Sequence, residues 1–244
     1  STFDQQGTRC NEDTGCDLQD CSTLADGTAC NSQDTCSVQG TCLAGACVPL
    51  STCPLCTTCD GAGSCVEKPR PDCTASLQPS KGQLQITDSA DDAADQLRWK
   101  WKAGPALSAE HFGNPQTSDD VALCVYSEQA DGPALVFGAS LPAGNCAKPP
   151  CWVSKNGKLS YKAGGDVASP ITGITLRSGA EGKTSAELRA AGSLMAAAGP
   201  FAPPLLTPLR TQLQIGNGAC LEVDFADTGV QSNEPGSFRA AGAA

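Results

Sequence analysis

Cysteine is the residue that most constrains how this chain can fold. The chain has 244 residues and 16 cysteines, twelve of them before residue 74. Reducing compartments keep thiols from pairing, so this frequency predicts disulfides and a secreted, extracellular location. Both parts hold an even number of cysteines, which favours pairing closed within each part. The cysteines are Cys10, Cys16, Cys21, Cys30, Cys36, Cys42, Cys47, Cys53, Cys56, Cys59, Cys65 and Cys73 in the first part, and Cys124, Cys146, Cys151 and Cys220 in the second.

Residues 1–73 are too poor in large apolar side chains to fold by burial alone. Glycines and aspartates, such as those of Asp26-Gly27 and Asp60-Gly61, alternate with the cysteines as turn formers. Each native disulfide contributes about 2–4 kcal/mol, which can offset the chain entropy of such a segment. The sequence therefore predicts a small, loop-rich, disulfide-rich module over residues 1–73.

Metal binding is the sharper alternative for these cysteines. The spacing of Cys53, Cys56 and Cys59 in CPLCTTC is also found in iron–sulfur and zinc sites. A fourth ligand would have to come from many competing cysteines, and His111 is the single histidine of the chain. Redox catalysis by a C-x-x-C pair needs a helix start in a βαβ unit, and the pattern predicts none. Disulfides are the favoured interpretation.

The pattern DGTAC, GTC, GAC over roughly residues 16–50 resembles the short cysteine-rich repeats that occur in tandem in large secreted proteins of myxobacteria and related bacteria. The resemblance implies an extracellular spacer or adhesion module without catalytic activity.

After Cys73 the pattern changes from cysteine-rich turns to strands. Residues 74–82, TASLQPSKG, predict a linker, and residues 83–244 predict a β-sandwich domain. Leu97, Trp99 and Trp101 alternate with basic residues, as in a strand with one buried side, so both tryptophans are expected in the core.

Short strands separated by turn residues fill this second part. They predict a mainly β fold, an antiparallel β-sandwich or jelly-roll-like domain, with a two-residue type I′ hairpin at Asn156-Gly157. Residues 188–199 are expected to be an extended loop, because glycines interrupt the segment and prolines follow it. The ten expected strands are 82–87, 96–102, 121–127, 133–138, 151–155, 158–163, 173–178, 185–190, 211–215 and 220–225.

The strand LRWKWKAG, then HFGNP, LCVYSE, CAKPPCW, KLSYK, GITLRSGAEGKT and CLEVDF, resemble a β-rich module at the C-termini of uncharacterised secreted proteins of the same bacteria. The likeness spans roughly residues 82–226 and implies no activity.

Two pairings are expected from position in this second part. Two prolines between Cys146 and Cys151 favour a local bridge beside Trp152. The remaining pair, Cys124 and Cys220, would then join an early strand to the last one.

Candidate catalytic and metal sites are weak. His111 has no G-x-S-x-G motif beside it, and the carboxylates lack the aromatic platforms of sugar sites, so no enzyme is expected. No cofactor is expected except calcium, for which the oxygens of one acidic run are a weak candidate; a solvated turn is favoured because the glycine-spaced calcium loop is absent. That run contains Asp88, Asp91, Asp92 and Asp95.

The chain carries a net charge of −10, and residues 1–73 hold ten carboxylates against Arg9, Lys68 and Arg70. This balance argues against nucleic acid and anionic lipid as partners. No apolar run is long enough for a membrane span, and Ser1 is expected to begin a mature chain after loss of a signal peptide.

The leading interpretation is a secreted, non-enzymatic structural protein of the cell surface or matrix that binds copies of itself and builds a filament. An uncharged, proline-rich apolar segment at residues 190–209 and open sheet edges favour it. The alternative is an adhesin or carbohydrate-binding module for surface glycans. The assembly residues are expected to be Leu194, Met195, Phe201, Leu205 and Leu206.

Overall fold

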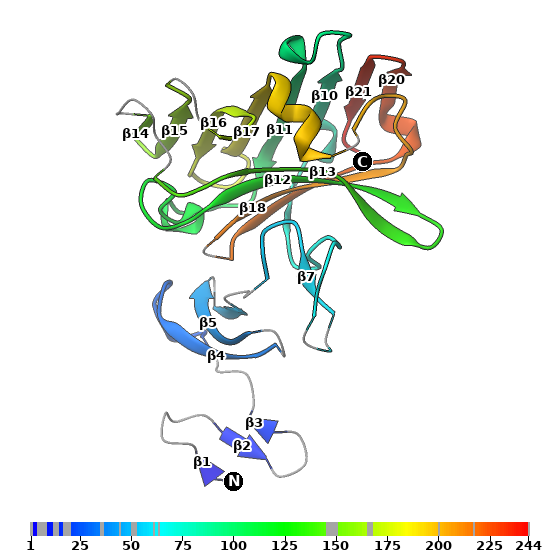
Figure 1. The fold of residues 1–244 in the computed structure, drawn as a ribbon. Helices are drawn as coiled ribbons and strands as arrows, with labels where there is room; N and C mark the ends of the chain where they lie inside the picture. The colour runs from blue at the N-terminus through cyan, green and yellow to red at the C-terminus, as the bar shows by residue number, and fades with distance from the viewer. Residues whose placement is uncertain are drawn as a thin grey trace.

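The chain forms an antiparallel β-sandwich with a disulfide-rich segment packed against one of its sheets (Figure 1). No helix among the described residues is both long and apolar enough to cross a membrane. The computed structural model describes residues 2–3, 9–11, 15–16, 21–34, 37–43, 45–49, 53–60, 62, 64–144, 151–164, 168–199, 201–216 and 218–243.

The large sheet of the sandwich has eight strands in the order β14-β15-β16-β17-β11-β10-β21-β20, and every neighbouring pair is antiparallel. Its strands are β10 (Gln83–Thr87), β11 (Gln96–Gly104), β14 (Trp152–Lys155), β15 (Lys158–Lys162), β16 (Ile171–Arg177), β17 (Thr184–Ala191), β20 (Val230–Glu234) and β21 (Ser237–Ala241).

The small sheet has five strands in the order β13-β12-β18-β19-β9, of which β9 runs parallel to β19. Its long strands lie crosswise to those of the large sheet in Figure 1, an orthogonal packing of two sheets. The strands of the small sheet are β9 (Thr74–Ala75), β12 (Val121–Gln129), β13 (Gly132–Leu141), β18 (Leu209–Ile215) and β19 (Cys220–Phe225).

Short 3-10 helices lie between strands: η1 (Pro79–Lys81), η2 (Asp92–Ala94), η3 (Glu110–Phe112), η4 (Ser193–Ala198) and η5 (Asp227–Gly229).

The core lies between the two sheets, and the alternation in β11 builds its centre. Leu97, Trp99 and Trp101 are all buried, which confirms their prediction as core residues on one face. The Trp99 indole Nε1 donates a 2.7 Å hydrogen bond to Thr211 Oγ1 of the opposite sheet. The Trp101 ring fills the space where a side chain on Gly104 would begin, because a Cβ there would lie 1.7 Å from the ring.

All ten predicted strands are present within a few residues of their expected bounds. Asn156 and Gly157 both have positive φ, 51° and 69°, and connect β14 to β15, as a type I′ turn requires. The predicted linker, residues 74–82, contains β9 and η1.

The last two strands, β20 and β21, were not predicted. Residues 237–241 contribute β21 between β10 and β20 in the large sheet, where Phe238 and Ala240 are buried. One aromatic and small alanines give too weak a period-two signal to identify a central strand.

The segment expected as an extended loop at residues 188–199 is instead the end of β17 followed by η4. The helical turn places Met195 in the core, and Phe201 packs against Phe137 with ring centroids 4.9 Å apart. Met195, Phe201 and Leu205 are buried in their own sandwich and cannot form an assembly surface, which corrects that prediction. Leu194 and Leu206 are exposed, at 44% and 67%.

The cysteine-rich part forms small sheets rather than a single core. Disulfides Cys21–Cys42 and Cys30–Cys47 join its middle sheet, and Cys53–Cys65 closes the β7–β8 pair. Its strands are β1 (Thr2–Phe3), β2 (Arg9–Asn11), β3 (Gly15–Cys16), β4 (Ala29–Asp34), β5 (Ser37–Leu43), β6 (Ala46–Pro49), β7 (Thr58–Cys59) and β8 (Cys65–Val66).

None of the described cysteines is free. Cys59 and Cys151 are also disulfide-bonded. The side chains of Cys10, Cys16, Cys36 and Cys146 lie outside the described residues, and so does the expected Cys146–Cys151 pairing.

Two disulfides cross between the parts of the chain, which corrects the expectation of closed pairing. Cys124 is bonded to Cys56, and Cys220 is bonded to Cys73, so the predicted pair Cys124–Cys220 does not form. An even number of crossing bonds leaves both counts even, so parity could not reveal them.

Candidate binding surface

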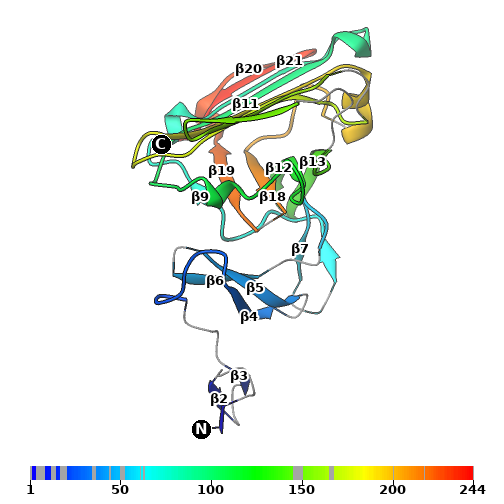
Figure 2. The ribbon, with the colours of Figure 1, turned by 90° about the vertical axis from the view of Figure 1, so that its left-hand side faces the viewer.

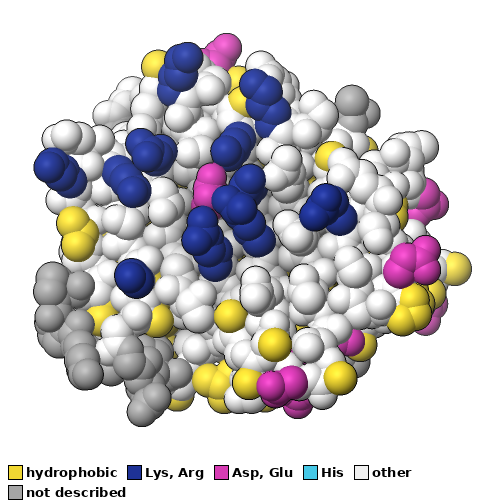
Figure 3. All heavy atoms as spheres, turned by 90° about the horizontal axis from the view of Figure 1, so that it is seen from above, with side chains coloured by type: hydrophobic (Ala, Val, Ile, Leu, Met, Phe, Trp, Pro, Cys, Tyr) yellow, Lys and Arg dark blue, Asp and Glu magenta, His cyan; other side chains and the backbone are white. Residues whose placement is uncertain are grey.

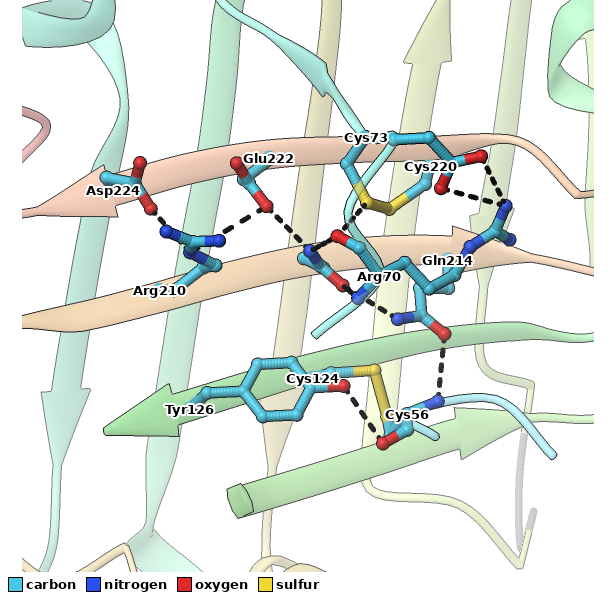
Figure 4. The surroundings of a disulfide bond; sticks show 12 residues. Cys56, Arg70, Cys73, Cys124, Tyr126, Arg210, Gln214, Cys220, Glu222 and Asp224 are labelled. Atoms are coloured by element: carbon cyan, nitrogen blue, oxygen red, sulfur yellow. Dashed lines mark hydrogen bonds and ion pairs between the residues drawn. A yellow bond between two sulfur atoms is a disulfide. The ribbon is translucent and has the colours of Figure 1, made fainter. Parts of the chain in front are cut away.

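The outer face of the small sheet is occupied by the chain's own disulfide-rich segment. Figure 4 shows Cys56 and Cys73 joined to Cys124 and Cys220 on this face, with the intervening Arg70 also against the sheet. Figure 2 shows the cysteine-rich strands β4 to β6 on the same side of the sandwich, away from the large sheet. The outer face of the small sheet is therefore an internal interface.

Polar side chains of the small sheet hold the backbone of this segment. The Cys56 N–H donates to Gln214 Oε1 at 2.9 Å, and the Tyr126 hydroxyl donates to the Cys56 carbonyl at 2.9 Å. Gln212 accepts from the Arg70 N–H at 2.9 Å and donates to the Arg70 carbonyl at 2.8 Å. The two glutamines therefore satisfy buried peptide groups much as a neighbouring strand would.

A charged group lies at the end of this interface. Arg210 lies 3.0 Å from Asp224, 3.2 Å from Glu128 and 3.9 Å from Glu222. Burial raises the pKa of Glu222, while the Gln212 amide and the Arg210 charge act in the opposite direction. One guanidinium thus faces three carboxylates, so the group keeps a negative excess.

The outer face of the large sheet, in contrast, is open and basic. Figure 3 looks down on it and shows Lys and Arg side chains spread across the sheet, with few acidic side chains among them. Nine of the 16 Lys and Arg residues of a chain with net charge −10 lie here. We call this the basic face; its cations are Arg98, Lys100, Lys102, Lys155, Lys158, Lys162, Arg177, Arg189 and Arg239.

Strand register, rather than sequence proximity, brings these cations together. Residues paired directly across a sheet point to the same side, and Lys158 is opposite both Lys155 and Arg177. Another such row crosses six strands and follows the order Arg239, Gln85, Arg98, Arg189, Gly173, Lys162.

Glu187 lies among these cations on β17. It is 3.4 Å from the Lys102 ammonium and 3.8 Å from the Arg98 guanidinium. Lys100 donates a 2.9 Å hydrogen bond to Gln83, and its pKa is lowered first by burial and then by the positive charges of Arg98 and Lys102. Glu187 opposes that effect. The face therefore keeps a positive excess that Glu187 only partly balances.

Three adjoining hollows lie along the second row. A hollow of about 240 Å³ lies between Arg239 and Arg98, one of about 370 Å³ between Arg98 and Arg189, and one of about 520 Å³ over Gly173. The first two share Gln85 and Arg98, and the last two share Arg189. Together they form a shallow depression across the strands, which we call the trough.

The trough is lined by charge and hydrogen-bonding groups. No aromatic side chain occupies an outward position on the described strands of this sheet; Tyr161 points inward and is 3% exposed. Glutamines and threonines fill the positions between the cations: Gln83, Gln85, Thr87, Gln96, Thr172, Thr175 and Gln231.

The site residues predicted from sequence lie elsewhere. Asp95 accepts from the Ser89 N–H and Asp91 caps η2, so these carboxylates support a turn. Among the described residues, three or more potential ligand atoms gather only at Cys21, Cys30 and Cys42, all of them in disulfides. The structure does not bring the four aspartates together for calcium.

His111 belongs to η3 and is half-buried next to Phe112. Burial lowers the pKa of His111, and the negative charge of Asp26 acts in the opposite direction.

The basic face was not predicted from the sequence, although one strand gave a signal. The alternation of Arg98, Lys100 and Lys102 with buried residues marked a polar side of β11, but nothing in the sequence joined it to Arg189 or Arg239. Net charge averaged over the chain concealed the segregation of charge.

No protein-family model, curated protein or solved structure matches this chain. The resemblance to secreted myxobacterial proteins thus stays a prediction.

Proposed function

We propose that this chain is a secreted, non-enzymatic protein of a cell surface or extracellular matrix that adheres to acidic surface polymers through the basic face. The observation that carries the proposal is the segregation of nine cations onto one uncovered sheet face of an otherwise acidic chain. A patch of one sign attracts an oppositely charged polymer and favours its capture.

The disulfides support the extracellular part of the proposal. Five pairs join described cysteines, and such bonds persist in oxidising compartments. The two that cross to the small sheet fix the disulfide-rich segment on one side of the sandwich. None of the described segments covers the opposite side, which can therefore contact a surface.

Binding of the purified full chain to immobilised polymers tests this proposal. We expect it to bind polygalacturonate and dextran sulfate, to release them as salt is raised, and not to bind neutral dextran. The double variant R98Q/R239Q should weaken binding about tenfold at low ionic strength. K68Q/K81Q removes the same charge outside the basic face and should leave binding near the wild-type level.

Equal weakening by both double variants would show that only net charge matters and would place the site elsewhere. Binding that ignores salt would also contradict the proposal.

Self-assembly is the second candidate, and charge complementarity favours it. Residues 1–73 carry ten carboxylates against three cations, and the described strands β4 to β6 lie on the side of the sandwich opposite the basic face (Figure 2). A contact between the acidic part of one copy and the basic face of the next would not close on itself and would build a filament. Sedimentation at low and high salt, with R98Q/R239Q as the variant, would reveal salt-sensitive polymers.

A further inference from the structure

We infer that the trough is a binding site for one extended chain of an acidic polysaccharide, lying across the strands along the row from Arg239 to Lys162. The inference rests on the proposed function. It assigns the bound polymer to one row of residues on the basic face and to one orientation, across the strands. Five strand spacings separate the ends of the row, about 24 Å at the usual distance between strands.

The chemistry of the lining selects the ligand class. Arginine recognises carboxylate and sulfate groups through its planar pair of N–H donors, and glutamine and threonine exchange hydrogen bonds with hydroxyl groups. Along the row, Arg98 and Arg189 separate hollows that are lined by Gln85 and Thr172. A polymer that carries both acidic groups and hydroxyls fits this alternation.

The same lining disfavours other polyanions. Proteins that hold single-stranded nucleic acid stack bases on aromatic side chains, and the outward positions of the described strands offer none. Proteins that insert into a lipid surface use exposed apolar side chains. Among the outward positions of the described strands, Val153 is the single large apolar residue that is more than a third exposed.

Gly173 lines the hollow of about 520 Å³ and pairs with Lys162 of β15. Glycine weakens a strand interior and often marks a bulge or a close approach by a ligand. The bulge here is at Thr172, whereas Gly173 itself returns to register with Lys162 and Arg189. Neither its φ nor its surroundings require glycine, since a Cβ at Gly173 would meet only the Tyr161 carbonyl at 3.7 Å, an ordinary contact. The fold does not require a glycine at this position, and the absence of a side chain leaves room for a ligand.

The Gly173→Asn variant separates the trough from the general charge of the face, because it fills the hollow without changing charge. We expect G173N to weaken polygalacturonate binding about tenfold while the melting temperature stays near that of the wild type. Ser185→Asn is the matched control: Ser185 points to the same face, opposite Lys102 and Arg177, and lines none of the three hollows. It should bind within about twofold of wild type. G173A, with a smaller side chain, should fall between them.

Oligogalacturonides of increasing length give a readout that needs no variant. We expect affinity to rise with length until the oligomer spans about 24 Å and then to level off. Affinity that continues to rise in proportion to length would overturn the inference.

The outcomes distinguish the inference from the proposed function. Salt-sensitive binding that R98Q/R239Q weakens but G173N does not would leave the proposed function in place and overturn the trough. Absence of binding to any acidic polymer would overturn both. Competition by duplex DNA as strong as that by polygalacturonate would assign the face to another occupant and overturn the inference. Salt-sensitive self-association that G173N does not affect would do the same.

Discussion

Arg98 on β11 and Arg189 on β17 are direct cross-strand partners on the outer face of the large sheet. Like charges that face each other across a sheet oppose its stability, and Glu187 pairs with Arg98 at 3.8 Å but lies on the same strand as Arg189. This repulsive pair lowers the stability of an otherwise well-packed sheet. Binding sites often contain residues that lower stability in this way.

The first prediction separates the effect of Arg189 on stability from its effect on ligand binding. The Arg189→Gln variant should be as stable as the wild type or more stable by about 0.2–1 kcal/mol, because it removes the repulsion from Arg98. Its affinity for acidic polymers should fall. Urea unfolding and polymer binding measure the two effects, and a variant that loses stability and keeps binding would show that Arg189 serves the fold.

The second prediction uses the opposite sign of charge. The Glu187→Gln variant removes the carboxylate that pairs with Lys102 at 3.4 Å and with Arg98 at 3.8 Å, and so leaves both cations available to a ligand. Binding to acidic polymers should become tighter, by about threefold to tenfold at low salt, with the gain vanishing as salt is raised. Weaker binding by E187Q would show that Glu187 itself holds the ligand or positions the cations.

The third prediction concerns pH. The pKa of Lys100 is lowered by burial and by Arg98, Lys102 and Arg189, while Glu187 raises it. Lys100 is charged below its pKa, so binding should weaken as pH rises through a range beneath that of an ordinary lysine. In the unfolded chain Lys100 keeps its proton to higher pH than in the folded protein. The free energy of unfolding should therefore rise with pH between the folded and the unfolded pKa of Lys100.

Lys100→Arg is the control for this pH dependence, because arginine stays charged throughout the range. The difference between wild type and K100R in polymer affinity should grow as pH rises. Parallel pH profiles of the two proteins would contradict the assignment.

How much the sequence could predict depended on the distance over which the residues act. Strands such as β11 were visible because Trp99 and Trp101 alternate with cations within seven residues. The pairing of Cys56 with Cys124 was not, because it depends on how a segment folds against a sheet. The basic face was hidden for the same reason: Arg98 and Arg189 are 91 positions apart and meet only through strand order.

The fourth prediction tests the disulfides that cross between the parts. Peptide mapping without reduction should link the Cys124 peptide to Cys56 and the Cys220 peptide to Cys73, and a Cys124–Cys220 link would contradict the structure. The C56S/C124S variant should lose about 2–5 kcal/mol of stability. C53S/C65S, which opens a loop of 12 rather than 68 residues, should lose less, because shorter loops constrain the unfolded chain less.

The fifth prediction concerns the hydrogen bond that joins the two sheets through the core. Thr211→Val keeps the shape of the side chain but leaves the buried Trp99 Nε1 without its acceptor, and it also removes the 3.1 Å bond from Thr211 to the Val223 carbonyl. The variant should lose about 1–3 kcal/mol. Trp99→Phe removes the donor and should cost stability through lost volume as well.

A double-mutant cycle isolates the bond between these two residues. In W99F/T211V no indole donor is left unpaired, so the double variant should be more stable than the sum of the single changes predicts, by about 0.5–3 kcal/mol. The exposed-face change Thr175→Val should alter stability by less than about 0.5 kcal/mol and is the control for threonine replacement on a strand. Strict additivity of W99F and T211V would show that the two sheets are held together by packing alone at this point.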